Sequence, residues 1–291
     1  MSVLASAAAV AAAEPIPVLH AIVLGITQGL SEFLPISSSG HLILVPWLFG
    51  WTELGGASAD LNRTFDVALH LGTLLGVVAY FRRDLVRLVT AGLGALGRRK
   101  VETTDERLAL LLALATVPGV VVGALLESTV ADALTAIWLV AVLLIVFGLV
   151  LAAADRSSGR RTVETLGVRD AVVMGCAQAL ALSPGVSRSG ATMSAGRWLG
   201  LGRDAAARVS FLMSVPITAG AVAFQGAKVV AAGGLPAGAA PAFVWGTLTS
   251  AVTGTLAVWL VLRIVRTRSF TPFVVYRVVV GAAVLALLAV R

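Results

Sequence analysis

The chain has 291 residues, of which 58% are hydrophobic and only 13% are charged. An average soluble domain is about 25% charged, and a soluble fold of this size could not cover so much apolar side chain because its surface must face water. This composition excludes a disordered chain, a secreted disulfide scaffold and an ordinary cytosolic enzyme, and it predicts an α-helical protein with several membrane crossings. The net charge of +7 comes from basic residues in short loops, so it indicates cytoplasmic loops and no nucleic-acid partner.

Six apolar segments are long enough to cross a hydrocarbon core of about 30 Å. In chain order they are residues 65–81, 108–126, 134–154, 209–227, 242–262 and 273–290. Two further apolar regions, 16–50 and 170–202, are interrupted at their centres by segments rich in Pro, Gly and Ser, Leu34–His41 and Ser183–Gly190. Polar backbone at membrane depth is tolerated only where protein buries it or where it lines a wet cavity. We therefore expect both regions to be re-entrant helical hairpins, each returning to the side from which it entered.

The charges of the loops give the orientation. Four loops are rich in arginine, as expected on the cytoplasmic side: 82–107, 155–170, 197–208 and 263–272. Loop 127–133 has two acidic and no basic residues, and loop 228–241 has only Lys228, so both are expected outside. This alternation requires region 170–202 to enter from the cytoplasm and return to it, and it predicts that the two hairpins enter from opposite sides.

The two interrupted regions resemble each other at a constant offset of 150 residues. Six of 16 aligned positions are identical: Gly25 and Gly175, Gln28 and Gln178, Leu30 and Leu180, Ser37 and Ser187, Ser39 and Ser189, Gly40 and Gly190. Each half then holds one hairpin and three full crossings, and an odd number of crossings inverts the second half relative to the first. We expect one all-α membrane domain, residues 1–291, built as an inverted-topology internal repeat with halves at about 16–154 and 168–290.

The first interruption carries a candidate nucleophile and a candidate base. Ionisable side chains deep in apolar segments are functional candidates, and Glu32, His41 and Arg188 are of this kind. Gln28 lies one helical turn before Glu32 and shares its helix face. A serine hydroxyl becomes nucleophilic when a base lies beside it, and His41 follows Ser37, Ser38 and Ser39 directly. The alternative is that Glu32 is a buried carboxylate satisfied by Arg188 or by backbone.

The second interruption has the composition of an anion site. Gly185 permits a tight turn, a helix beginning nearby would add its positive end, and Arg188 can grip two phosphate oxygens. The hydroxyls of Ser187, Ser189 and Thr192 add donors. The alternative is a helix cap with a structural arginine. Together, the two interruptions suit phosphoryl transfer, in which positioning and charge stabilisation dominate.

Both segments resemble the signatures of a known family. Residues 28–41, QGLSEFLPISSSGH, and 184–192, PGVSRSGAT, resemble the two signatures of bacterial undecaprenyl-diphosphate phosphatases, also called bacitracin resistance proteins. The resemblance covers nearly the whole chain. It implies the hydrolysis of undecaprenyl diphosphate to undecaprenyl phosphate, which recycles the lipid carrier for peptidoglycan synthesis, supports cell shape and confers bacitracin resistance.

The resemblance also implies roles for residues. Ser38 corresponds to the family's proposed nucleophile, His41 to its acid/base, Glu32 to its acidic residue and Arg188 to its phosphate clamp; Ser37 and Ser39 are substitutes for Ser38. The family motif has Glu or Gln where this chain has Gln28, which weakens that position as a metal ligand. The resemblance also allows a Mg²⁺ or Ca²⁺ cofactor with Glu32 as a ligand. It leaves open whether the reaction passes through a covalent phosphoserine or uses an activated water.

The implied setting is a multi-pass protein of the bacterial plasma membrane whose partners are a polyprenyl diphosphate lipid and the bilayer, with the oligomeric state open between monomer and homodimer. Two other functions share parts of this pattern. Inverted repeats are also typical of transporters, so a polyprenyl-phosphate transporter or flippase could use the same anion site. A phosphatase of the phosphatidic-acid type would need a second histidine six residues after Arg188, where this chain has Ser194.

Overall fold

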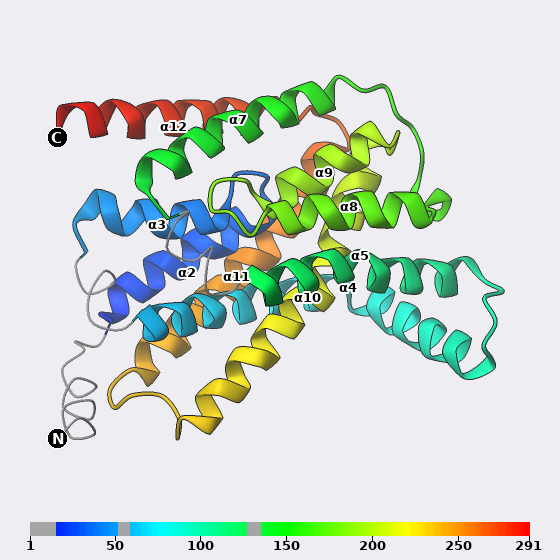
Figure 1. Ribbon diagram of the computed structural model, residues 1–291, viewed down its shortest axis with the longest axis horizontal. Coiled ribbons are helices and arrows are strands. Elements are labelled where there is room, and N and C mark those ends of the chain that lie inside the picture. Colours follow the sequence, from blue (N-terminus) through cyan, green and yellow to red (C-terminus); the bar gives the residue numbers. More distant parts are fainter. Residues whose placement is uncertain (1–15, 52–58, 127–134) are drawn as a thin grey trace.

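The computed structural model describes residues 16–51, 59–126 and 135–291 (Figure 1). Within these ranges the chain forms ten α-helices and one short 3-10 helix, Val163–Thr165, and the only β-type pairing is an isolated bridge between Arg161 and Leu201. The expected outer loop 127–133 lies outside the described residues. The all-helical prediction is confirmed for the part of the chain that the structure describes.

Six of the described helices are long and apolar enough to cross a membrane. They are α4 (Ala59–Arg98), α5 (Thr104–Leu126), α7 (Ile137–Asp155), α10 (Arg203–Ala231), α11 (Ala240–Val265) and α12 (Thr271–Val290). Each overlaps one of the six expected segments, and most are longer than the segment expected. Large apolar side chains face outward from them, including Trp138, Leu149 and Val279, which are 58%, 56% and 60% exposed. Soluble surfaces rarely expose so much large apolar side chain, so the chain is a multi-pass membrane protein.

The expected loop 82–107 is wrong in its extent. Helix α4 has a kink at Phe81, where φ is −94° and ψ is 16°, and then continues as helix to Arg98. Residues 82–98 contain no proline and many good helix formers such as Leu, Ala and Arg, so the helix has no reason to end at the edge of the apolar segment. The reversal into α5 is short and is held by an ion pair between Arg98 and Glu106.

The remaining four helices form two pairs of short helices. Helix α2 (Val18–Phe33) is followed after four residues by α3 (Ser38–Phe49), and α8 (Val168–Leu180) is followed after seven by α9 (Arg188–Trp198). Figure 1 shows that both connections lie in the middle of the molecule. The outer ends of α2 and α3 are at the left of that view, and the outer ends of α8 and α9 are at the right.

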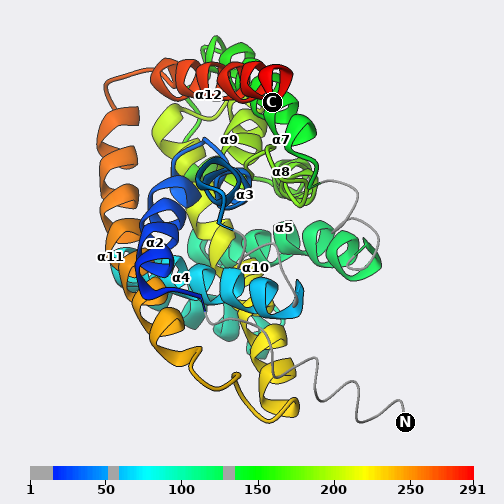
Figure 2. The same ribbon diagram turned by 90° about the vertical axis from the view of Figure 1, so that its left-hand side faces the viewer.

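Glycines let the short helices approach the long ones closely. Helix α2 packs along α11 and α8 packs along α5 (Figure 2). A methyl group on Gly25 would lie 2.4 Å from the carbonyl oxygen of Gly246 in α11, and one on Gly175 would lie 2.5 Å from that of Ala115 in α5. Small residues at such crossings are the usual device of helix packing in membranes. The contacts hold the two central connections in place from outside.

Candidate active site

The two central connections end in the same local structure. Ser37 precedes α3 and has φ 77°, and its Oγ accepts the backbone N–H of Gly40 at 3.3 Å. Ser187 precedes α9 and has φ 74°, and its Oγ accepts the N–H of Gly190 at 3.1 Å. Positive φ is uncommon outside glycine. Each serine caps a helix N-terminus, so the next residues, Ser38 and Arg188, are the first residues of two helices that begin near each other.

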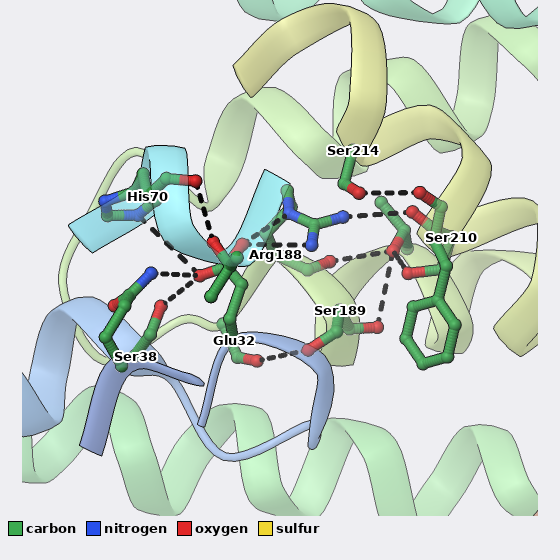
Figure 3. A network of polar contacts seen from close by, with 12 residues as sticks. Glu32, Ser38, His70, Arg188, Ser189, Ser210 and Ser214 are labelled. Atoms are coloured by element: carbon green, nitrogen blue, oxygen red, sulfur yellow. Dashed lines mark hydrogen bonds and ion pairs between the residues drawn. The ribbon is translucent and has the colours of Figure 1, made fainter. Parts of the chain in front are cut away.

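The carboxylate of Glu32 joins the two helix beginnings (Figure 3). Its Oε1 accepts from Arg188 Nε at 3.2 Å and from Nη2 at 3.0 Å. Its Oε2 accepts from the Ser38 hydroxyl at 2.5 Å and from Gln28 Nε2 at 3.1 Å. The alternative reading, a buried carboxylate satisfied by Arg188, therefore describes the contacts correctly, but it leaves the Ser38 hydroxyl and the nearby cavity unexplained.

Arg188 is held on its other side by α10. Its Nη1 donates to the carbonyl oxygen of Ser210 at 2.9 Å. The hydroxyl of Thr192 bonds the Ser210 hydroxyl at 2.7 Å and also donates to the carbonyl of Arg188 at 2.7 Å. Ser189 donates to the carbonyl of Leu34 at 3.0 Å, which ties α9 to the first connection. Thr192 and Ser189 thus position Arg188, and neither lines the cavity described next.

A cavity of about 220 Å³ opens beside the Glu32–Arg188 pair. Its polar lining comes from α2, α3, α4, α9, α10 and the second connection, and its apolar lining comes from α4, α10 and Ala181. The lining residues are Glu32, Ser38, Ser39, Val67, His70, Ala181, Ser187, Arg188, Ile217, Thr218 and Ala221. The cavity therefore offers a hydroxyl, a carboxylate, a guanidinium and two helix N-termini to an anionic group, and it also has apolar lining.

His41 does not line this cavity. Its Nδ1 lies 2.7 Å from the carbonyl oxygen of Ser37 and its Nε2 lies 2.8 Å from the hydroxyl of Tyr276 in α12. Because a carbonyl only accepts, Nδ1 carries the proton, and in the neutral ring Nε2 accepts from Tyr276. His41 and Ser38 are close in sequence, but the side chain of His41 contacts Tyr276 of α12 and that of Ser38 contacts Glu32.

The histidine that does line the cavity is His70 of α4. Its Nε2 lies 3.7 Å from Oε2 of Glu32, and its Nδ1 donates to the carbonyl of Asp66 at 2.7 Å. From the sequence, His70 is expected to be an interfacial or satisfied core residue near the end of a crossing, because no motif surrounds it. The available signal was its position four residues after Asp66 in a predicted crossing, since ionisable residues inside crossings usually have a function.

Arg277 is a second residue that sequence reasoning missed. Its side chain is fully buried and donates to carbonyl oxygens of both connections, Pro35 at 3.2 Å and Gly185 at 2.8 Å, and to Leu144 of α7 at 3.0 Å. Pro35 and Gly185 are also related by the offset of 150 residues. The signal was a single arginine five residues into the expected crossing 273–290. Arg277 satisfies backbone carbonyls that have no water at this depth.

Gly185 contributes through its backbone. It has φ 97°, its N–H donates to the Ser37 hydroxyl at 3.1 Å, and a methyl group on it would lie 2.7 Å from the carbonyl oxygen of Val140. Only glycine fits this place without strain. Of the expected phosphate-binding residues, Arg188 and Ser187 line the cavity, while Gly185, Ser189 and Thr192 support them.

The side chains at this site supply only some of the ligands that a divalent cation needs. Among the described residues there is no group of three or more His, Cys, Asp or Glu side chains that could hold a metal ion. The Oε1 atom of Gln28 is buried and has no hydrogen-bond partner there, and it lies on the side chain that donates to Glu32. Mg²⁺ is often held by one or two carboxylates together with substrate phosphates. In that mode, Glu32 and Gln28 would be the residues of this chain that hold the cation.

Comparison with known proteins agrees with the motifs. The family model described as bacitracin resistance protein BacA matches residues 21–283. An undecaprenyl-diphosphatase of Geobacter sulfurreducens is 47% identical over 276 residues, which are 94% of this chain and 99% of that protein. Proteins of the same name from Desulforudis audaxviator and Nocardioides sp. are 49% and 44% identical, each over 93% of this chain and 97% and 96% of their own length. The chain belongs to the bacitracin resistance protein BacA family.

Proposed function

We propose that this protein hydrolyses undecaprenyl diphosphate to undecaprenyl phosphate and inorganic phosphate in the bacterial plasma membrane. The relatives described above are named for that activity, and they align with nearly the whole chain. The observation that carries the proposal here is the Ser38–Glu32–Arg188 network beside a cavity lined by both polar and apolar side chains. The activity would recycle the lipid carrier for peptidoglycan synthesis. The names of the relatives favour hydrolysis over the transport alternative.

The chemistry follows from what each group can do. Arg188 would release its hydrogen bonds to Glu32 Oε1 and donate to oxygens of the terminal phosphate instead. The N-termini of α3 and α9 would add N–H donors to the same anion. Glu32 would accept the proton of the Ser38 hydroxyl as Ser38 Oγ bonds to the terminal phosphorus. The bond from that phosphorus to the bridging oxygen would break, and undecaprenyl phosphate would leave. Water would then bond to the phosphorus, the bond from the phosphorus to Ser38 Oγ would break, and Oγ would take back the proton held by Glu32 as inorganic phosphate leaves.

Direct attack by water on the terminal phosphorus is the second route that this site permits. Ser38 would then orient the water, and Glu32 would accept its proton. In either route Glu32 is better placed as the base than His41, whose two ring nitrogens are engaged by Ser37 and Tyr276. We propose that His41 positions the start of α3. A divalent cation, held by Glu32 and Gln28, would neutralise charge on the diphosphate when bound.

We also propose that the two pairs of short helices are re-entrant hairpins in an inverted repeat that forms one membrane domain over residues 1–291. The halves are about 16–154 and 168–290. Three observations support this: the matched caps Ser37 and Ser187, the exchange by which α2 packs on α11 while α8 packs on α5, and the opposite ends from which the pairs enter (Figure 1). A homodimer stays a prediction from the sequence.

The decisive assay is phosphate release from undecaprenyl diphosphate by the purified full-length protein in detergent. We expect release by the wild type and loss of release in the Ser38→Ala and Arg188→Ala variants. Full activity in both variants would show that the site is elsewhere. Lipid movement in proteoliposomes without phosphate release would instead support the transporter.

A further inference from the structure

A second cavity, rich in arginine, lies where α7 and α9 end and α10 begins. It has a volume of about 830 Å³ and shares no lining residue with the candidate active site. It is lined by Asp155, Arg156, Ser157, Ser158, Gly159, Arg160, Arg197, Gly202, Arg203, Asp204, Val265 and Arg266. Five arginines thus face two aspartates, and nothing in the proposed hydrolysis uses any of them.

The wall of this cavity is a loop that Arg197 holds rigidly. Arg197 is 3% exposed, and it donates to the carbonyl oxygens of Gly159 at 3.1 Å and Leu201 at 2.6 Å and to that of Ser157. The Ser157 hydroxyl donates back to the carbonyl of Arg197 at 2.9 Å. The Nε of Arg197 is buried and has no partner among the described residues. The loop is therefore fixed before any ligand arrives, which lowers the entropy cost of binding.

The positive charge of the cavity is only partly neutralised. Arg203 bonds Asp155 at 2.5 Å and Arg266 bonds Asp204 at 3.1 Å. Within the described ranges, Arg156 and Arg160 have no hydrogen bond or ion pair from their side chains, and both are exposed. Two guanidinium groups without partners thus line the same cavity, and guanidinium groups bind phosphate oxygens through paired N–H donors.

The neighbouring tryptophans place the cavity at the depth of lipid headgroups. Trp198 follows Arg197 directly and is 58% exposed. Trp259 of α11 is 48% exposed, and the Arg263 guanidinium lies 5.5 Å from its ring. Exposed tryptophan is enriched at membrane–water interfaces, and the arginine-rich end of a membrane protein faces the cytoplasm. Basic pockets between helices on that side suit anionic headgroups.

We propose that this cavity binds the phosphate group of an anionic lipid headgroup on the cytoplasmic side, through Arg156 and Arg160. The site is separate from the candidate active site and does not depend on the proposed hydrolysis. Arg203 and Arg266 are paired with Asp155 and Asp204, so the two free arginines carry the binding, and the loop held by Arg197 keeps them in place.

The test is hydrogen exchange of the segment 156–161 in the full chain, in nanodiscs of phosphatidylcholine. Three probes are titrated: dioctanoyl phosphatidic acid, dioctanoyl phosphatidylcholine and inorganic phosphate. We expect phosphatidic acid to slow exchange in this segment and phosphatidylcholine to leave it unchanged. The Arg156→Gln/Arg160→Gln variant should need about tenfold or more phosphatidic acid for the same protection, since it loses charge-assisted hydrogen bonds.

The matched control is Arg169→Gln/Arg268→Gln, which removes the same charge from the same arginine-rich end but from exposed residues outside the cavity. It should behave as the wild type. Equal weakening in both double variants, or no protection by phosphatidic acid, would overturn the proposal. Equal protection by inorganic phosphate alone would show that the bound phosphate group need not belong to a lipid, and this would overturn the proposal of a lipid site. If the double variant fails to fold, Arg160→Gln alone makes the same comparison against Arg268→Gln.

Discussion

Arg188 and Glu32, 156 residues apart, form a two-pronged ion pair in which Nε and Nη2 reach Oε1 at 3.2 and 3.0 Å. The pair joins the first turn of α9 to the last turn of α2. In the proposed mechanism the same guanidinium must bind phosphate, so the pair stabilises the resting site and supplies the clamp.

The first prediction separates these two roles. Arg188→Lys keeps the charge beside Glu32 but loses the fork, so we expect hydrolysis to fall by about 10²–10³-fold while the protein still folds. Arg188→Ala leaves the buried carboxylate unpaired and should also lower the free energy of unfolding by about 3–5 kcal/mol. Arg188→Ala/Glu32→Gln should regain stability without activity. Thermal unfolding and phosphate release measure the two effects, and an active Arg188→Lys enzyme would refute the clamp.

The second prediction distinguishes neighbouring serines. Ser38 donates to Glu32 at 2.5 Å, whereas Ser39 lines the cavity without such a bond. We expect Ser38→Ala to lower hydrolysis by roughly 10³-fold or more, and Ser39→Ala by less than about tenfold. With a substrate labelled in its terminal phosphate, rapid quenching should trap label on the wild type and none on Ser38→Ala. Loss of activity in Ser38→Ala with no label on the wild type would favour direct attack by water.

The third prediction concerns the histidines. His70 lines the cavity and its Nε2 lies 3.7 Å from Glu32, while His20 stacks on Trp51 at 3.8 Å between ring centres. We expect His70→Ala to lower hydrolysis by about 10- to 100-fold, because the cavity loses an imidazole beside Glu32 that can take part in proton transfer. His20→Ala is the matched control and should keep full hydrolysis. Activity that is unchanged in His70→Ala would restrict the site to Ser38, Glu32 and Arg188.

How far the sequence could predict this site depends on how local each feature is. Ser38 and Arg188 were predictable because a repeated motif places each of them directly after a capping serine. The separation of His41 from the cavity was not predictable, since it depends on Tyr276, which is 235 residues away. Arg277 was hidden because one arginine does not break an apolar crossing, and its carbonyl partners come from three different parts of the chain. The length of α4 was missed because the apolar segment that marks the crossing ends at Phe81, whereas residues that favour a helix continue to Arg98.

The fourth prediction tests Arg277 as the link between the two connections. Arg277→Lys keeps the charge but cannot reach Pro35, Gly185 and Leu144 together, and the freed carbonyls are buried. We expect a loss of about 2–4 kcal/mol in the free energy of unfolding, and a fall in hydrolysis because Ser38 and Arg188 lose their relative placement. Arg268→Lys, on an exposed residue, is the matched control and should change neither. A stable, fully active Arg277→Lys protein would show that the connections hold without it.

The last prediction compares glycines that have no room for a methyl group with one that has. A methyl group on Gly25 would lie 2.4 Å from a backbone oxygen of α11, and one on Gly175 would lie 2.5 Å from a backbone oxygen of α5, whereas one on Gly123 meets no atom within 4 Å. Gly25→Ala and Gly175→Ala should each force the helices apart and lower stability by about 1–3 kcal/mol. Gly123→Ala should raise it by up to about 1 kcal/mol, because alanine favours helix over glycine.

Thermal unfolding in one detergent compares the three variants. Because Gly25 and Gly175 occupy equivalent places in the two proposed halves, their variants should lose similar amounts of stability and of hydrolysis. If Gly175→Ala were as stable as Gly123→Ala while Gly25→Ala was not, the packing of α8 on α5 would not be the counterpart of α2 on α11. The inverted repeat would then rest on the connections alone, where Ser37 and Ser187 share their backbone conformation.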